Sequence, residues 1–559
     1  MDATAWGFMS GAEGVIESLQ RAGIRGLFVD PAAGQLPSPE FCAGRQVRLL
    51  YANLAGSASI MADAAARATG QPGACLLAQE GGFFRSAGLL RLSRIDSVPL
   101  VAMVLAENVA EPELGLAGVC KGLYQIEAPE EIPPVLAQAV QLARDGEPGP
   151  VLVRLSRGAL SGCGWMRGTG FRQGPRPLEE EAQKQLDRLV EWLEEAEQVA
   201  IYAGAGCLDA GEELQQLCEK LAAPLATTIS GAGALPFQHP LAAGYGPPPT
   251  GWPLADEAFS GSRLVLAVGC KTPPATLSQL PDCRTVLIDT RPQAPAGEDW
   301  FCVCAPIKPA LRYLLERVPF RTRPELQQQL LEGKKRLRKV LAGLAAGEGN
   351  TELLSLQVFV ELRELLAAED FLLLDSGRQA ACALAAFMPQ QPRGLLLPVG
   401  AGLAGWSIPA AVAVSALFPE RRVVACVGEG SFTETAFELL SARRCDLAPV
   451  VVVFSPSAPE RLPSVGRLVA RETVRELAPV NLENAAHALD CAYFCAAAED
   501  ELAAALRGAL TAERPALVEL KLRYPEIRLM EKLARSDGAL PRGLWLRLAA
   551  RALHQQLLA

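Results

Sequence analysis

The stretch from Met61 to Gly73, which reads MADAAARATGQPG, decides how the first part of this chain folds. With the residues before it, this stretch predicts a helix from Ser57 to Ala68, and Gly73 to Ala78 then form a short apolar run. A run of this kind is typical of a strand that is buried on both faces. We therefore expect a helix that leads into a strand of a covered parallel sheet.

The same alternation of helices and apolar strands extends on both sides of this stretch. Repeated β and α segments with fully apolar strands indicate a parallel sheet that helices cover on both faces. A stretch rich in Gly, Arg and Pro, from Gly162 to Pro177, predicts a linker after this unit. The other elements expected before the linker are a helix at Gly11 to Ala22 and strands at Gly26 to Val29, Val98 to Leu105 and Pro150 to Leu155.

Two further units repeat the pattern. We therefore predict an α/β fold with three doubly wound parallel-sheet domains, at residues 1–165, 180–320 and 350–528, followed by a helical tail at 529–559. The elements expected in the later units are helices at Leu178 to Ala196 and Pro324 to Leu341, and strands at Gln198 to Ala203, Leu264 to Val268, Thr285 to Asp289, Phe371 to Leu374, Arg422 to Val427 and Pro449 to Phe454.

Composition limits the classes of function. The 559 residues carry a formal net charge of −9, which argues against a nucleic-acid partner, because such binding needs a clustered basic face. No run of about 18 apolar residues lacks charges or turn formers, so we expect no membrane span. Residues Met1 to Ser10 lack the basic and apolar regions of a secretory signal, and we expect a cytoplasmic protein.

Cysteine and histidine usage argues against a metal centre of these residues. The 15 cysteines occur without a CxxC pair or zinc-ligand spacing, and we interpret them as small buried hydrophobes. The closest pairs are Cys302 with Cys304, expected on one face of a strand, and Cys491 with Cys495, expected one helical turn apart. Only three histidines occur, which leaves no room for a multi-histidine site.

Several strings of the chain resemble one enzyme family. The stretch from Met61 to Gly73 resembles the pyrimidine-binding domain of acetolactate synthases and related 2-oxoacid decarboxylases and carboligases. The resemblance covers nearly the whole chain in the family's domain order and implies pyrimidine-binding, middle and diphosphate-binding domains. The other matching strings are Asp96 to Ala102, Ala223 to Thr228, His239 to Leu241, Leu266 to Gly269, Asp375 to Gly377, Ile408 to Ala411, Val424 to Phe432 and Glu438-Leu439.

The resemblance implies thiamine diphosphate and Mg²⁺ as cofactors. In this family a glutamate of the first domain activates the aminopyrimidine ring of the cofactor. A hard cation, held by an aspartate and an asparagine of the third domain, tethers the diphosphate, and a bulky aliphatic side chain bends the cofactor. Each cofactor lies between two subunits, so the resemblance also implies a dimer or a tetramer.

The pyrimidine side of this site departs from the family. The glutamate position falls on Ala55, and no carboxylate lies between Glu40 and Asp63. An alanine cannot exchange a proton, and general acid-base assistance is typically worth ~10²–10⁴ in rate. If another group takes this role, our candidate is Glu80, in a loop that also contains Phe83 and Phe84.

The diphosphate side departs as well. The family's Gly-Asp-Gly string reads Gly428-Glu429-Gly430, and its paired asparagines fall on Ser455 and Pro456. The extra methylene of glutamate moves the carboxylate by roughly a bond length, which near-octahedral Mg²⁺ tolerates poorly. The candidate metal ligands are Glu429 and Ser455. The candidate cofactor-binding residues are Gly377, Gln379, Ala404 at the wedge position, Gly428, Gly430 and Ser431.

Three hypotheses follow from this pattern. The leading one is a catalytically impaired relative with a degenerate cofactor site, present as a homo-oligomer or as a partner subunit of an active relative. The second is a thiamine-diphosphate-dependent lyase or carboligase that acts on a 2-oxo acid with altered cofactor anchoring. The third is a cleft for a different ligand, with Phe83, Phe84 and Trp406 as its aromatic lining.

A flavin is not expected in the middle domain. The turn Gly204-Ala205-Gly206 follows a predicted strand, but a lone Gly-x-Gly is weak support for a nucleotide. The Phe-Asp-Asp-Arg string that the family has after Val268-Gly269 is replaced here by Cys270-Lys271-Thr272-Pro273.

Overall fold

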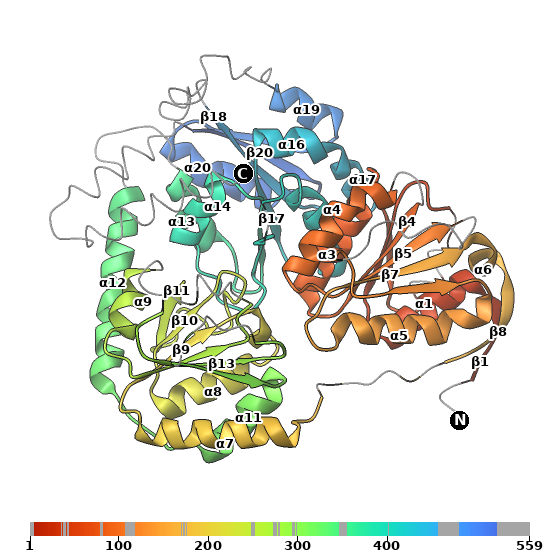
Figure 1. The fold of residues 1–559 in the computed structure, drawn as a ribbon. Coiled ribbons are helices and arrows are strands. Elements are labelled where there is room, and N and C mark those ends of the chain that lie inside the picture. Colours follow the sequence, from red (N-terminus) through yellow and green to blue (C-terminus); the bar gives the residue numbers. More distant parts are fainter. Residues whose placement is uncertain are drawn as a thin grey trace, which may run out of the picture.

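Three α/β units, each built on a six-stranded parallel sheet, make up the fold (Figure 1). This arrangement confirms the predicted class of three doubly wound parallel-sheet domains. Within the described residues, no helix combines the length and the apolar character that a membrane span needs. The structure is a computed structural model, and it describes residues 5–34, 36, 41, 44–78, 82–106, 118–168, 170, 174, 176–246, 252–271, 277, 280–292, 297, 299–345, 355–400, 402–456 and 480–522.

Helices cover both faces of the first sheet. The elements of the first domain are β1 (Ala5–Ser10), α1 (Gly11–Arg21), β2 (Gly26–Val29), β3 (Arg48–Tyr51), α3 (Ser57–Thr69), β4 (Gly73–Ala78), α4 (Gly82–Ile95), β5 (Leu100–Ala106), β6 (Leu123–Ile126), η1 (Pro129–Glu131), α5 (Ile132–Arg144), β7 (Pro150–Ser156), α6 (Arg157–Ser161) and β8 (Cys163–Arg167). The strand order is β3-β2-β4-β5-β7-β6. One apolar core joins α1 and α5 to the sheet, and a second joins α3 to its other face.

The middle sheet has the strand order β11-β10-β9-β12-β13-β14. Its elements are α7 (Glu180–Glu195), β9 (Val199–Ala203), η2 (Ala205–Cys207), α8 (Gly211–Leu221), β10 (Leu225–Thr227), β11 (Ala242–Tyr245), α9 (Pro253–Phe259), β12 (Leu264–Val268), β13 (Arg284–Asp289), β14 (Trp300–Cys304) and α11 (Ile307–Arg317), and the long helix α12 (Pro324–Ala345) follows them.

The third sheet has the strand order β16-β15-β17-β18-β20-β19. Its elements are α13 (Ser355–Leu365), β15 (Phe371–Leu374), α14 (Arg378–Ala386), β16 (Leu395–Leu396), α15 (Ser407–Leu417), β17 (Val423–Gly428), α16 (Glu429–Thr435), η3 (Ala436–Glu438), α17 (Leu439–Arg444), β18 (Val450–Pro456), α19 (Leu482–Ala488), β19 (Ala492–Ala496), α20 (Glu499–Leu510) and β20 (Ala516–Leu522).

Two local expectations were wrong. Part of the predicted linker, Cys163 to Arg167, is the strand β8, which pairs antiparallel with β1 at the edge of the first domain (Figure 1). The pair Cys491 and Cys495 does not lie on a helix, because Cys495 belongs to β19 and Cys491 directly precedes that strand. The predicted tail at 529–559 lies outside the described residues.

Helix α3 packs between its own sheet and helix α15 of the third domain. Its alanines let the two helices approach closely, and Ala62 and Ala65 share an apolar core with Val412 and Ala416. All eleven residues of α15 are buried. The stretch that begins at Met61 therefore holds the first domain against the third as well as against its own sheet.

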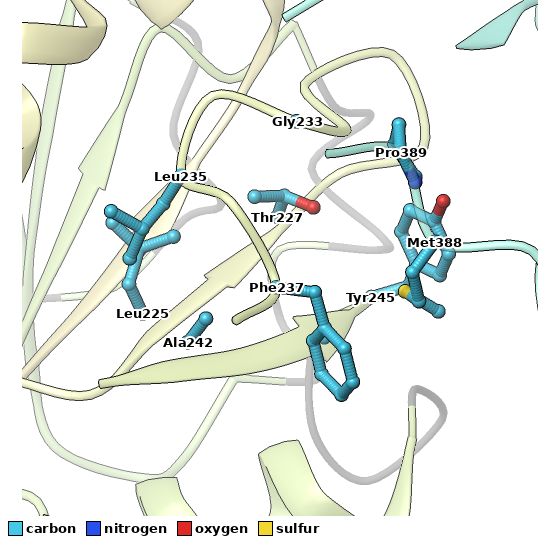
Figure 2. A pocket seen from close by; sticks show the side chains of 10 residues that line it. Leu225, Thr227, Gly233, Leu235, Phe237, Ala242, Tyr245, Met388 and Pro389 are labelled. Atoms are coloured by element: carbon cyan, nitrogen blue, oxygen red, sulfur yellow. The ribbon is translucent and has the colours of Figure 1, made fainter. Parts of the chain in front are cut away.

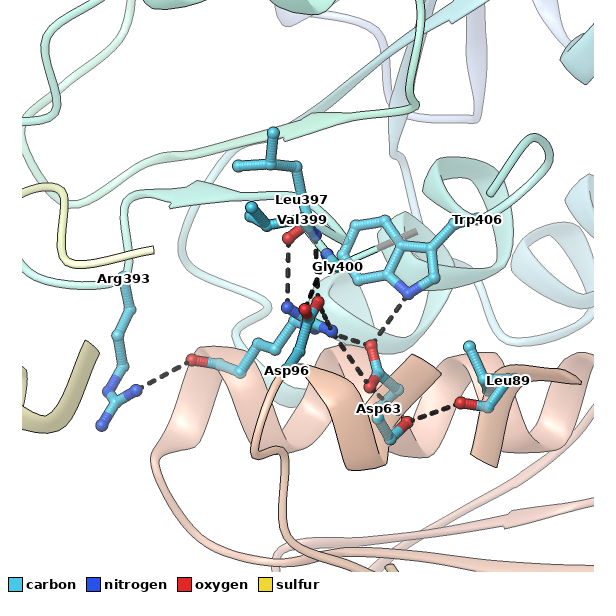
Figure 3. Close-up of polar contacts among 10 residues, drawn as sticks. Asp63, Leu89, Asp96, Arg393, Leu397, Val399, Gly400 and Trp406 are labelled. Carbon is cyan, nitrogen blue, oxygen red and sulfur yellow. Dashed lines mark hydrogen bonds and ion pairs between the residues drawn. The ribbon is translucent and has the colours of Figure 1, made fainter. Parts of the chain in front are cut away.

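A buried charged network crosses this seam (Figure 3). Arg67 donates from Nε to Asp63 at 2.7 Å and from Nη2 to Asp96 at 2.8 Å, and its side chain is 11 % exposed. The indole Nε1 of Trp406 donates to Asp63 at 2.9 Å, and the backbone N–H of Gly400 donates to Asp96 at 2.7 Å. Both carboxylates of the first domain thus bind donors of the third.

The guanidinium of Arg67 stays charged in this setting. Burial by itself would lower the pKa of Arg67, but the adjacent Asp63 and Asp96 carboxylates raise it above its usual value. Arg393 extends the network, because it donates to the carbonyl oxygen of Arg67 at 3.2 Å and to Asp209 of the middle domain at 2.7 Å. All three domains therefore meet at one set of charges.

Removal of the Arg67 charge should destabilise the protein strongly. We expect Arg67→Met to lower the stability by about 3–5 kcal/mol, because two buried carboxylates lose their counter-charge. Arg336→Met is the matched control, since its pair with Glu257 is exposed and is worth about 1 kcal/mol or less. Differential scanning calorimetry of both variants tests this, and equal losses of melting temperature would contradict it.

Candidate functional site

Two buried carboxylates hold the backbone of the loop that leads into α3. Glu438, at the end of η3 in the third domain, accepts the N–H of Asn53 at 2.8 Å and that of Leu54 at 3.0 Å. Asp30, directly after β2, accepts the N–H of Gly56 at 3.0 Å. The loop is therefore fixed from two domains at once.

Ala55 lies in the middle of this fixed loop. The next residue, Gly56, is the N-cap of α3 with φ of 90°, and a Cβ there would lie 3.0 Å from the Cβ of Arg85, so the turn needs glycine. Ala55 itself is exposed. The loop therefore leaves room for a larger side chain at residue 55, although the sequence supplies only a methyl group.

Asp30 is one of two buried carboxyl groups that bind the backbone on either side of Ala55, since Asp30 accepts the N–H of Gly56 and Glu438 accepts that of Leu54. The Asp30 side chain is 1 % exposed, and its Oδ2 has no hydrogen-bond partner within the described residues. Oδ2 lies against Gly82, where a Cβ would come within 1.7 Å of it. Burial raises the pKa of Asp30, and the nearby charge of Glu438 adds to this, while backbone N–H groups partly offset the shift.

The predicted residues of the diphosphate side meet at one edge of the third sheet. The neighbouring strands β15, β17 and β18 are parallel, so the residues at their carboxyl ends lie close together. Asp375, directly after β15, is fully buried and accepts the N–H of Gly405 at 2.9 Å and that of Ser407 at 2.7 Å. Burial raises the pKa of Asp375. This carboxyl group fixes the turn that carries Ala404, which is exposed.

Glu429 and Ser455 are in direct contact. Glu429 opens α16, and its Oε2 accepts the Ser455 hydroxyl at 3.2 Å. Its Oε1 accepts the N–H of Val480 at 3.0 Å. Both oxygens of this carboxylate therefore already bind donors of the protein itself.

The remaining predicted residues surround this contact. Gln379 is buried, and its Nε2 lies 3.4 Å from the carbonyl oxygen of Asp375, while Ser431 hydrogen-bonds the Asp375 carboxylate. Gly377 is exposed, and the Gln379 side chain lies close to its Cα. A Cβ on Gly377 would lie 2.5 Å from the Oε1 of Gln379.

Among the described residues, a Cβ on Gly428 or on Gly430 would meet no atom within 4 Å. The candidate Glu80 lies outside the described residues, so its role stays a prediction.

Mg²⁺ does not fit the carboxylate of Glu429 as it stands. The cation takes about six oxygen ligands in near-octahedral geometry, whereas Oε1 faces the positive end of the Val480 N–H. Within the described residues, no three His, Cys, Asp or Glu side chains are grouped as a metal site.

The hypothesis of an aromatic lining was wrong. Trp406 is fully buried in the apolar core, and its indole N–H binds Asp63. Phe83 is 3 % exposed and packs in a different core, whereas Phe84 is 61 % exposed. These three side chains line no common cleft, because only one of them reaches the surface.

The Gly-Ala-Gly turn of the middle domain packs against protein. A Cβ on Gly204 would lie 2.1 Å from the carbonyl oxygen of Gly269, and the N–H of Gly206 donates to that oxygen at 3.1 Å. The glycines are therefore required for the close approach of the loops after β9 and β12. Their presence needs no bound nucleotide as an explanation.

Figure 2 shows an apolar cavity between the middle and third domains, lined by Leu225, Thr227, Gly233, Leu235, Phe237, Ala242, Gly244, Tyr245, Met388 and Pro389. Its volume of about 20 Å³ suffices for a water molecule, since one needs roughly 10–15 Å³ by the same measure. This cavity is too small for a substrate.

Sequence reasoning missed the roles of three carboxyl groups. Asp30, Asp375 and Glu438 were not candidates, although Asp30 and Asp375 each directly follow an apolar strand. A carboxylate at the carboxyl end of a parallel strand lies where such folds place their sites, and this signal was available. Glu438 gave no comparable signal, because its partners lie 384 and 385 residues away.

Comparison with known families adds three matches. The thiamine pyrophosphate enzyme N-terminal TPP binding domain matches residues 9–125, the central domain matches residues 186–305, and the C-terminal TPP binding domain matches residues 375–520. The three matched ranges together span more than half of the chain.

Curated relatives cover most of the chain at modest identity. A probable 2-ketoarginine decarboxylase of Pseudomonas aeruginosa is 27% identical over 80% of this chain and 81% of its own length. A probable acetolactate synthase large subunit of Methanocaldococcus jannaschii is 26% identical over 80% of each chain. The acetolactate synthase isozyme 3 large subunit of Escherichia coli is 27% identical over 80% of this chain and 82% of its own.

The raised pKa of Asp30 predicts a pH-dependent effect of Asp30→Asn. A carboxyl group whose pKa is higher in the folded state stabilises the fold fully only below its unfolded pKa, and this contribution is lost as pH rises through the folded value. The two proteins should therefore melt at similar temperatures at acid pH, and the asparagine variant should become the more stable one as pH rises.

Melting curves of both proteins across the pH range measure this difference. Glu434→Gln, a change at an exposed glutamate of α16, is the control and should leave the profile unchanged. A difference between wild type and Asp30→Asn that stays constant with pH would show that Asp30 does not carry the shift.

Proposed function

Because this chain belongs to the thiamine pyrophosphate enzyme family, we propose that it is an acetolactate synthase-like member with a degenerate cofactor site, catalytically impaired when it acts alone. The observation that carries this proposal is Ala55. The loop around it is held by Glu438 and Asp30, so the backbone is in place while the proton-exchanging side chain is missing. The absence of a proton-exchanging side chain at residue 55 is therefore not explained by a displaced loop.

The state of Glu429 supports the same proposal. Its two oxygens are engaged by Ser455 and Val480, and residue 456 is a proline without a side-chain oxygen. The two halves of the cofactor site are thus altered independently, one in each domain. A single local rearrangement would not restore both.

We propose that the chain acts in the cytoplasm as a subunit of an oligomer, either with itself or with an active relative. This part of the proposal rests on the family resemblance, in which each cofactor lies between two subunits. A flavin in the middle domain is not part of the proposal, since the turn after β9 is closed by Gly269.

A second function is favoured by one specific observation. The 3.2 Å between Glu429 Oε2 and Ser455 Oγ also suits two neighbouring ligands of one cation, and no atom of the described residues would lie within 4 Å of a Cβ on Gly428 or Gly430. The alternative is therefore a thiamine-diphosphate-dependent lyase or carboligase that acts on a 2-oxo acid with altered anchoring, in which Glu80 relays the proton.

Calorimetry and repair of the site test the leading proposal. Titration of the purified chain with thiamine diphosphate and Mg²⁺ should give no binding in the micromolar range. The triple variant Ala55→Glu, Glu429→Asp, Ser455→Asn should gain binding, because it restores the proton-exchanging group and an oxygen-rich ligand set. Addition of Ala55→Glu to the double variant Glu429→Asp, Ser455→Asn should raise turnover of pyruvate by ~10²–10⁴.

The double variant without Ala55→Glu is the matched control, since it can bind the cofactor but cannot activate it. Micromolar binding and pyruvate turnover by the unmodified chain would overturn the proposal. In that case the variant Glu80→Gln tests whether Glu80 relays the proton. A large loss of turnover supports this role, and an unchanged rate excludes it.

A further inference from the structure

We propose that Glu429 is a metal-free structural staple, which joins the ends of two strands to the returning chain at Val480. The inference deepens the proposed function on which it rests, because it says what the altered carboxylate does instead of holding a cation. It concerns the single contact set of Glu429, Ser455 and Val480.

The geometry is that of a tether between three segments. Glu429 begins α16 directly after β17, Ser455 lies in β18, and Val480 is where the described chain resumes after residue 456. One carboxylate oxygen accepts the hydroxyl of Ser455 and the other accepts the N–H of Val480. The staple therefore fixes the position at which the chain returns to the sheet.

The length of the side chain suits this role. A glutamate carries its carboxylate one methylene farther from the backbone than an aspartate does, and here it reaches a backbone N–H 51 residues along the chain. Asn481, the next residue, caps α19, with its Oδ1 accepting the N–H of Asn484 at 2.8 Å. The Glu429 contact and this cap together fix the start of α19.

Hydrogen exchange of the full-length protein tests the staple. Glu429→Ala should speed exchange of the Val480 amide by about tenfold or more, because its hydrogen bond to a charged acceptor is lost. Glu429→Gln should restore most of the protection, since its amide oxygen still accepts from Val480 and its amide nitrogen can donate to Ser455. Glu434→Ala, in the same helix, should leave the exchange unchanged.

Ion-binding measurements test whether Glu429 holds its contacts without a metal ion. Electron paramagnetic resonance with Mn²⁺ alone should show no site of micromolar affinity in the unmodified chain, and inorganic pyrophosphate with Mg²⁺ should not slow the exchange of Val480. A Mn²⁺ site that Glu429→Gln abolishes would overturn the inference, as would added protection by pyrophosphate or unchanged exchange in Glu429→Ala.

The two proposals fail in different ways. Mn²⁺ bound at Glu429 without turnover of a 2-oxo acid contradicts the staple and leaves the impaired subunit standing. Turnover with thiamine diphosphate in a chelated, metal-free solution contradicts the impaired subunit and leaves the staple standing.

Discussion

Charge buried between two domains constrains everything else in this structure. Asp63 and Asp96 lie in the seam because Arg67 forms an ion pair with both of them and because Trp406 and Gly400 supply donors from the other side. These directional contacts set one relative position of α3 and α15, which close-packed alanines alone would specify less sharply. The loop before α3 and the turn before α15 are positioned as a consequence.

The positions of both halves of the candidate site depend on this seam. The loop at residue 55 and the turn at residue 404 are each held through backbone N–H groups by a buried carboxyl group, Glu438 in one case and Asp375 in the other. Under the proposed function, the main chain of a cofactor site is kept while its side chains differ from the family's pattern. Fold and activity are separable here because different atoms carry them.

The sequence predicted elements where the signal is local. The apolar strands β4 and β15 have the predicted bounds, because a fully buried parallel strand reads as an unbroken apolar run. The ribbon of β1 and β8 was missed, since its strands are more than a hundred residues apart and β8 lies among Gly and Arg residues. Glu429 and Ser455 were predicted as metal ligands, but the bond of Glu429 to Val480 was not predicted, because no local pattern indicates a partner 51 residues away. Trp406 was misread for the same reason, since Asp63 lies 343 residues from it.

The contacts that hold the loop at residue 55 affect how such a protein can diverge in sequence. Glu438 and Asp30 grip peptide N–H groups, which every residue except proline provides, so the identity of the side chain between them is nearly irrelevant to folding. An ancestor could exchange its reactive group for a methyl group, and a descendant could reverse the exchange, without passing through an unstable intermediate. The scaffold therefore keeps a short evolutionary path open between a working subunit and a silent one.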